Sequence, residues 1–139
     1  MNINKLIENF ECPLINAIFF TNGDMLVLSN NNRHIEVLCK STVESFFNYN
    51  DRDSVSRFDI LKKYEEGRYI INVGEGSYGG DGIVQLKEKT GKLIWFLFLD
   101  NSNPFVKAEL KNDLIRAKST KDVKITIPIY NPEKITITK

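Results

Sequence analysis

The 139-residue chain has few of the side chains that build transition-metal, redox or nucleophilic sites. It contains one histidine, His34, and two cysteines, Cys12 and Cys39, with no metal-binding or redox spacing among them. No Gly-x-Ser-x-Gly sequence supports a serine hydrolase. We therefore expect no cofactor and no transition-metal site, and we expect both cysteines to be buried thiols in a reducing cytosol.

The chain also lacks a long apolar segment and a strong net charge. Its longest apolar run covers seven residues, whereas a membrane-spanning helix needs about 20. The N-terminus has no apolar core of a signal peptide. The net charge of +1 gives no whole-molecule reason to expect a membrane or nucleic-acid partner. We expect a cytoplasmic protein with a single domain over residues 1–139.

Most of the chain consists of short apolar-rich segments separated by glycine, asparagine or proline. This pattern predicts an α+β fold, mainly an antiparallel β-sheet, with one or two short helices in the N-terminal half. One helix is expected over residues 4–12, before Pro13, and another after the capping-box sequence that runs from Ser41 to Glu44. The expected strands are 14–20, 25–28, 35–39, 58–66 (also compatible with a helix), 69–73, 82–89, 93–99, 105–110, 114–117, 123–129 and 135–138.

The segment 68–105 is the centre of the predicted fold. The unbroken apolar run at 93–99 predicts a strand that is covered on both faces. A hairpin through Thr90-Gly91, expected to be a primed turn, would pair this strand antiparallel with 82–89. The glycine-rich loop 74–82 would then lead back to the strand at 69–73. This register predicts that Glu75, Asp81 and Asp100 gather at one end of a three-stranded meander.

Three roles are open for these carboxylates. They could cap turns by bonding to nearby amides, form a docking surface for a basic partner, or provide a Ca²⁺ or Mg²⁺ site or an acid–base pair. The loop also matches G-x-G-x-x-G, but a dinucleotide site needs a helix after the glycines and a strand is expected here. Tyr78 favours docking, because an exposed aromatic beside acids is a good interface anchor. The candidate partner-binding residues are Glu75, Ser77, Tyr78, Asp81, Asp100, Asn101 and Asn103.

The C-terminal third is mildly basic. Residues 107–139 contain eight Lys or Arg and four Asp or Glu. Lysines occur at 107, 111, 118, 121 and 124, and we interpret them as a solvated face, because a nucleic-acid groove would need aromatic side chains between them. Nucleic-acid binding by a small β domain that uses this basic third is kept as an alternative function.

The sequences at 74–82 (Gly-Glu-Gly-Ser-Tyr-Gly-Gly-Asp-Gly), 93–95 (Leu-Ile-Trp) and 100–105 (Asp-Asn-Ser-Asn-Pro-Phe) together resemble a pattern found in small bacterial immunity proteins. Those proteins bind and neutralise a cognate toxin domain of contact-dependent or other polymorphic toxin systems. The resemblance implies a stoichiometric inhibitor, not an enzyme, whose partner is a toxin domain. A hydrolase that uses the same carboxylates is the other alternative.

Overall fold

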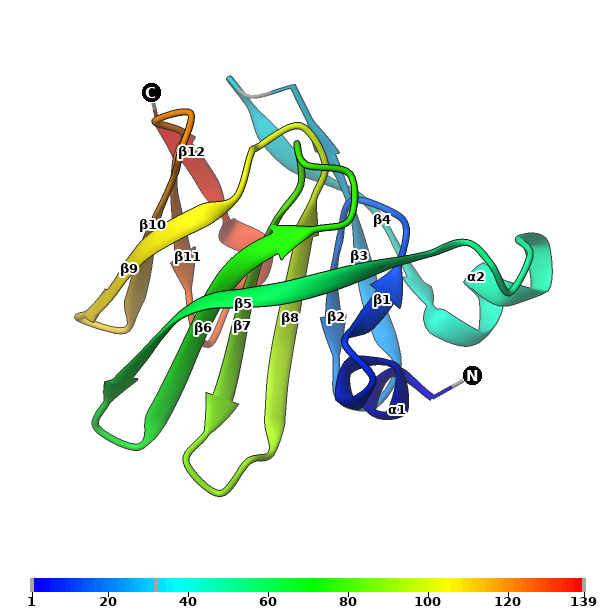
Figure 1. Cartoon of the computed structure of the whole chain (residues 1–139), viewed down its shortest axis with the longest axis horizontal. Coiled ribbons are helices and arrows are strands. Elements are labelled where there is room, and N and C mark those ends of the chain that lie inside the picture. The colour runs from blue at the N-terminus through cyan, green and yellow to red at the C-terminus, as the bar shows by residue number, and fades with distance from the viewer. Residues whose placement is uncertain (1, 32, 139) are drawn as a thin grey trace.

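The computed structural model describes residues 2–31 and 33–138, and it is built mainly from antiparallel strands (Figure 1). Two short helices lie in the N-terminal half, as the sequence predicts, and no helix of the described residues is long and apolar enough to cross a bilayer. The helical elements are α1 (Ile3–Glu8), α2 (Val43–Tyr49) and the 3-10 helix η1 (Pro132–Lys134). The strands are β1 (Glu11–Pro13), β2 (Ala17–Phe20), β3 (Asp24–Asn30), β4 (Ile35–Thr42), β5 (Val55–Glu66), β6 (Tyr69–Gly76), β7 (Gly82–Glu88), β8 (Leu93–Leu99), β9 (Phe105–Lys111), β10 (Leu114–Ser119), β11 (Lys124–Pro128) and β12 (Thr136–Thr138).

The strands form two sheets that pack face to face. The large sheet has the order β1-β5-β6-β7-β8-β2-β3-β4, and the small sheet has the order β12-β11-β10-β9. Every pairing is antiparallel. One apolar core lies between the two sheets, and a second lies on the other face of the large sheet, where α1 and α2 cover it. In Figure 1 the small sheet stands at the left and the two helices at the right, with α1 below α2.

Strand β8 contributes side chains to both cores, which confirms the prediction that both of its faces are covered. Trp95 and Leu97 point into the core between the sheets, whereas Phe96 and Phe98 point into the helix-covered core. The indole N–H of Trp95 donates a hydrogen bond to the carbonyl oxygen of Ile129 at 3.2 Å. Strand β8 therefore joins the large sheet to the segment that follows β11.

The N-terminal helix and first strands differ from the sequence prediction. Helix α1 ends at Glu8 instead of continuing to residue 12, because Phe10 takes a φ of +58° and turns the chain into the short strand β1. The strand expected at 14–20 begins only at Ala17. Helix α2 is capped by Thr42, not Ser41: the Thr42 hydroxyl accepts the Ser45 N–H at 3.0 Å.

Two further expectations were wrong. The β7–β8 turn is not of the primed type, because Gly91 has a φ of +97° while Thr90 does not have positive φ. The Gly91 N–H donates to the Glu88 carbonyl, so the turn runs from Glu88 to Gly91 and Gly91 is its last residue. The positive φ of Gly91 then turns the chain into β8. Both thiols are free, but only Cys12 is buried, while Cys39 is exposed on the edge strand β4.

Candidate functional site

The candidate site lies where β6 ends, β7 begins and β8 ends. Glu75 pairs with Gly82, and Gly82 pairs with Leu99, so Glu75, Asp81 and Asp100 reach the same end of three adjacent strands, as predicted. The two loops at this end, 77–81 and 100–104, run at the top of Figure 1. They are tied together by the Asn103 N–H, which donates to the Gly80 carbonyl at 2.7 Å.

Ser77 fastens the first loop to β5. Its hydroxyl accepts the N–H of Arg57 at 2.8 Å and donates to the carbonyl of Arg57 at 3.0 Å. The Ser77 N–H also donates to the hydroxyl of the buried Ser56 at 3.3 Å. Phe58 and Gly76 form the last backbone pair between β5 and β6, so the Ser77 hydroxyl takes the donor and acceptor roles of the next residue in the ladder.

Asp81 lies under the loop and is only 4 % exposed. Gly76 makes room for it, because a Cβ at position 76 would lie 2.7 Å from the Asp81 Cβ. Burial raises the pKa of Asp81; a hydrogen bond from the Tyr78 N–H lowers it and the charge of Asp100 raises it further. Burial, followed by the charges of Asp81 and Glu11, also raises the pKa of the Cys12 thiol well above its usual value. Asp81 therefore supports the loop from below instead of facing a partner directly.

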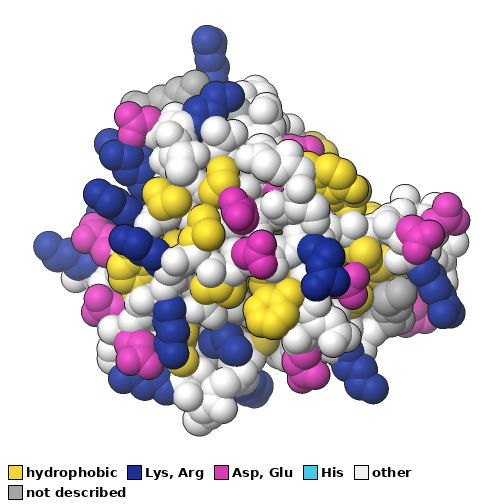
Figure 2. Space-filling model, in the orientation of Figure 1, with side chains coloured by type: hydrophobic (Ala, Val, Ile, Leu, Met, Phe, Trp, Pro, Cys, Tyr) yellow, Lys and Arg dark blue, Asp and Glu magenta, His cyan; other side chains and the backbone are white. Residues whose placement is uncertain are grey.

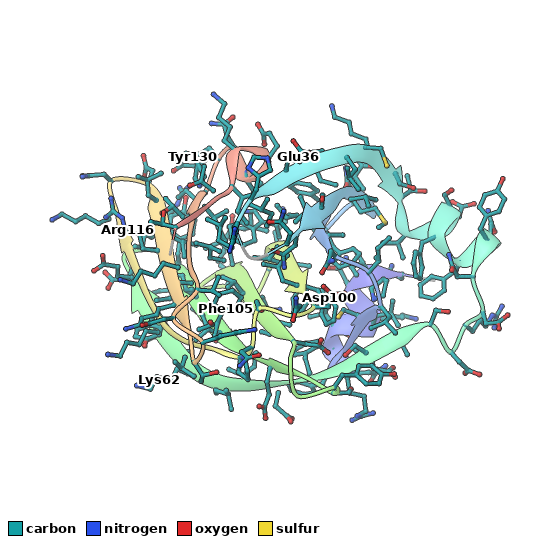
Figure 3. All side chains as sticks on the ribbon, turned by 90° about the horizontal axis from the view of Figure 1, so that it is seen from above. Glu36, Lys62, Asp100, Phe105, Arg116 and Tyr130 are labelled. Atoms are coloured by element: carbon teal, nitrogen blue, oxygen red, sulfur yellow. The ribbon has the colours of Figure 1, made fainter. Side chains whose placement is uncertain are left out.

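Asp100 is held by the loop that precedes β2. The Asn16 amide donates to the Asp100 carboxylate at 3.0 Å, and the Asp100 N–H donates to the Asn16 side-chain oxygen at 2.7 Å. The next turn uses two asparagines with positive φ, Asn101 at +62° and Asn103 at +63°, a conformation that asparagine adopts more readily than most residues. Figure 3 shows Asp100 between β8 and the N-terminal strands. This loop is thus fixed by bonds that span 84 positions of the sequence.

Tyr78 is the large side chain that the site presents to solvent. It is 67 % exposed at the tip of the first loop, while Glu75 is half-buried and Asp100 is exposed. Within residues 2–31 and 33–138, no three His, Cys, Asp or Glu side chains are grouped so that they could hold a metal ion. The arrangement is an aromatic side chain with acidic neighbours on two mutually bonded loops, which can anchor a protein partner.

The sequence prediction missed the residues that hold these loops. Asn16, Ser56 and Arg57 are distant in sequence and carry no motif, so only the three-dimensional pairing of β2 and β5 with the central strands identifies them. Comparison with protein-family models, curated proteins and solved structures gives no match. The resemblance to immunity proteins therefore stays a prediction based on the residues quoted above.

Proposed function

We propose that the chain is an immunity-type binding protein that acts in the cytoplasm and neutralises a cognate toxin domain by covering its active site or substrate surface. The contact region is the pair of loops 77–80 and 100–103, with Tyr78 at its centre. The observation that carries the proposal is the exposure of Tyr78 on a loop that is bonded to β5 on one side and to the second loop on the other.

A fixed loop favours tight binding. A partner that binds a mobile loop must offset the entropy lost when the loop becomes ordered, whereas here the bonds of Ser77 and Asn103 already restrict it. A tyrosine contributes a large apolar surface together with a hydroxyl, and few rotatable bonds are immobilised on contact. Tyr78 therefore has the character of a binding hot spot.

The charges around Tyr78 indicate the chemistry of the partner. Glu75 and Asp100 lie on either side of the buried Asp81 at this end of the sheet. Acidic rim residues increase the rate of association with a cationic surface and disfavour anionic ones. The matching toxin surface would offer an apolar pocket for the tyrosine ring, surrounded by lysine or arginine side chains.

Affinity capture with matched tyrosine variants tests this proposal. The tagged protein is expressed in its own cells, and co-purifying proteins are identified by mass spectrometry for wild type, Tyr78→Ala and Tyr49→Ala. Tyr49 is the control, because it is 86 % exposed at the end of α2, and Figure 1 shows α2 at the right of the molecule, away from the two loops at the top. We expect one toxin-type protein at near-equal stoichiometry with wild type and Tyr49→Ala.

Removal of a hot-spot tyrosine typically costs about 2 kcal/mol or more, which is roughly a 30-fold weaker affinity. Tyr78→Ala should therefore fail to retain the captured protein under stringent washing. Equal capture by Tyr78→Ala and wild type would reject the loop as the contact region, and the absence of any stoichiometric protein partner would reject the immunity function.

A further inference from the structure

Three lysines form a row across the outer face of the small sheet. Lys118 on β10 lies directly opposite Lys107 on β9 and directly opposite Lys124 on β11. The neighbours Ala108, Ala117 and Ile125 are buried on the inner face, so the lysines share the outer one. Adjacent strands are about 4.8 Å apart, so the backbone positions of the three lysines lie in a line of about 10 Å perpendicular to the strands. We call Lys107, Lys118 and Lys124 the lysine row.

Such a row is unfavourable for the fold by itself, because like charges directly opposite each other on paired strands repel. Lys118 has one compensating partner, Asp122, at 3.0 Å. Lys118, and to a smaller extent Lys124, lower the pKa of Asp122. Among the described residues, neither Lys107 nor Lys124 forms an ion pair of its own. The ammonium groups of Lys107 and Lys124 can therefore pair with an anionic ligand.

The lysine row lies in a groove of about 620 Å³. The end of β5 borders this groove with Lys62 and the half-buried Tyr64. Figure 2 shows Lys and Arg side chains along the left of the molecule, with Asp and Glu side chains between them, and Figure 3 places Lys62 and Arg116 on that same side. The only carboxylate that lines the groove within the described part of the chain is that of Glu109, which already pairs with Arg116 at 3.8 Å.

The polar groups of the groove are nearly all hydrogen-bond donors, and this selects the ligand. Lysine and arginine only donate, whereas the hydroxyls of Thr126 and Thr138 can both donate and accept. An acidic peptide would bring its own backbone N–H groups, for which these side chains offer few acceptors. A phosphodiester backbone has only acceptors and carries a charge at every unit, so it matches the donors and the positive charge of this surface.

We propose that the lysine row binds the phosphate backbone of a single-stranded nucleic acid that crosses β9, β10 and β11. Tyr64 is the single aromatic side chain that lines the groove in the part of the chain that the structure describes, so stacking on the bases is minor and binding does not depend on sequence. The sequence indicated a basic face that includes these lysines but not the row, because the register that aligns residues 107, 118 and 124 depends on two turns of different length. The site is separate from the Tyr78 loops, and its failure would leave the immunity function unaffected.

The test measures binding of a fluorescent oligothymidylate by anisotropy over a range of salt concentrations. The variant Lys107→Gln/Lys118→Gln/Lys124→Gln is compared with Lys40→Gln/Lys89→Gln/Lys92→Gln, which removes the same charge at exposed lysines outside the groove. We expect the first variant to bind at least tenfold more weakly than wild type at low salt. The slope of log affinity against log salt should fall by about 0.7 for each phosphate that a lysine no longer neutralises, or about 2 for the three lysines together. The control should stay close to wild type.

Thermal unfolding keeps the test interpretable. The substitutions remove like-charge repulsion together with the exposed Lys118–Asp122 ion pair, and an exposed pair contributes little to stability. The lysine-row variant should therefore unfold at a temperature close to that of wild type, so weak binding would not reflect an unfolded protein. Equal binding by the two triple variants would overturn the proposal. Two other results would also overturn it. One is that poly-glutamate competes as effectively as unlabelled oligonucleotide at the same charge concentration, and the other is that a DNA duplex binds as tightly as the single strand.

Discussion

Replacing Ser77 by alanine should loosen the loop that carries Tyr78. The substitution removes both bonds between the Ser77 hydroxyl and the backbone of Arg57, at 2.8 and 3.0 Å. A neutral hydrogen bond contributes about 0.5–1.5 kcal/mol net. Because Ser77 is exposed and water can replace part of both bonds, we expect Ser77→Ala to lower the free energy of unfolding by about 1–2 kcal/mol. For a domain of 139 residues the midpoint of thermal unfolding should fall by roughly 3–7 °C.

Urea denaturation and amide hydrogen exchange together measure this effect. Exchange at residues 78–80 should accelerate in Ser77→Ala, whereas exchange in the centre of β8 should follow only the global stability. Ser54→Ala, on the segment that leads into β5, is the matched control. If Ser77→Ala leaves both the unfolding free energy and the exchange of residues 78–80 unchanged, the hydroxyl does not extend the β5–β6 ladder, and the loop is ordered by other contacts.

Two further substitutions test how the loop junction is built. Asp81→Asn should stabilise the protein at neutral pH. Burial raises the pKa of Asp81 above its unfolded value of about 3.9, so the ionised carboxylate destabilises the folded wild type as the pH rises from this unfolded value through the folded pKa. The stability gain of Asp81→Asn, measured by urea titration, should therefore vanish near pH 3, where the carboxyl is protonated in both states. An equal gain at both pH values would contradict this origin. Gly82→Ala should cost about 2–3 kcal/mol, because a Cβ there would lie 2.5 Å from the Asn103 carbonyl and 2.6 Å from the Phe105 ring. Gly80→Ala has a nearest neighbour at 4.0 Å and should be close to neutral; similar urea midpoints for the two alanine variants would show that the junction can move apart.

The sequence was informative where structure is local. Turn residues and apolar runs predicted nearly every strand, and the unbroken run at 93–99 correctly predicted a strand buried on both faces. The shared position of Glu75, Asp81 and Asp100 also followed from hairpin register alone. Local patterns determine these features, because a short turn fixes which residues of its two strands are opposite each other.

The sequence was much less informative about long-range contacts. The sequence around Asp81 does not show that its side chain is buried, because this depends on how the loop folds back over the space left by Gly76. Asn16 and Arg57 became part of the site only when β2 and β5 had been placed in the sheet. The strand at 14–20 began later than predicted because residues 11–13 form an additional edge strand with β5. Such contacts depend on the packing of the whole sheet, which no local pattern encodes.

Growth protection by the tyrosine variants is the most direct test of the proposed function. The toxin domain identified by affinity capture is expressed in cells together with wild type, Tyr78→Ala or Tyr49→Ala, at matched levels of folded protein. We expect growth with wild type and Tyr49→Ala and arrest with Tyr78→Ala, since only the last variant removes the side chain at the centre of the contact region. Full protection by Tyr78→Ala would contradict the proposed function of this loop, because neutralisation would then not depend on its exposed tyrosine.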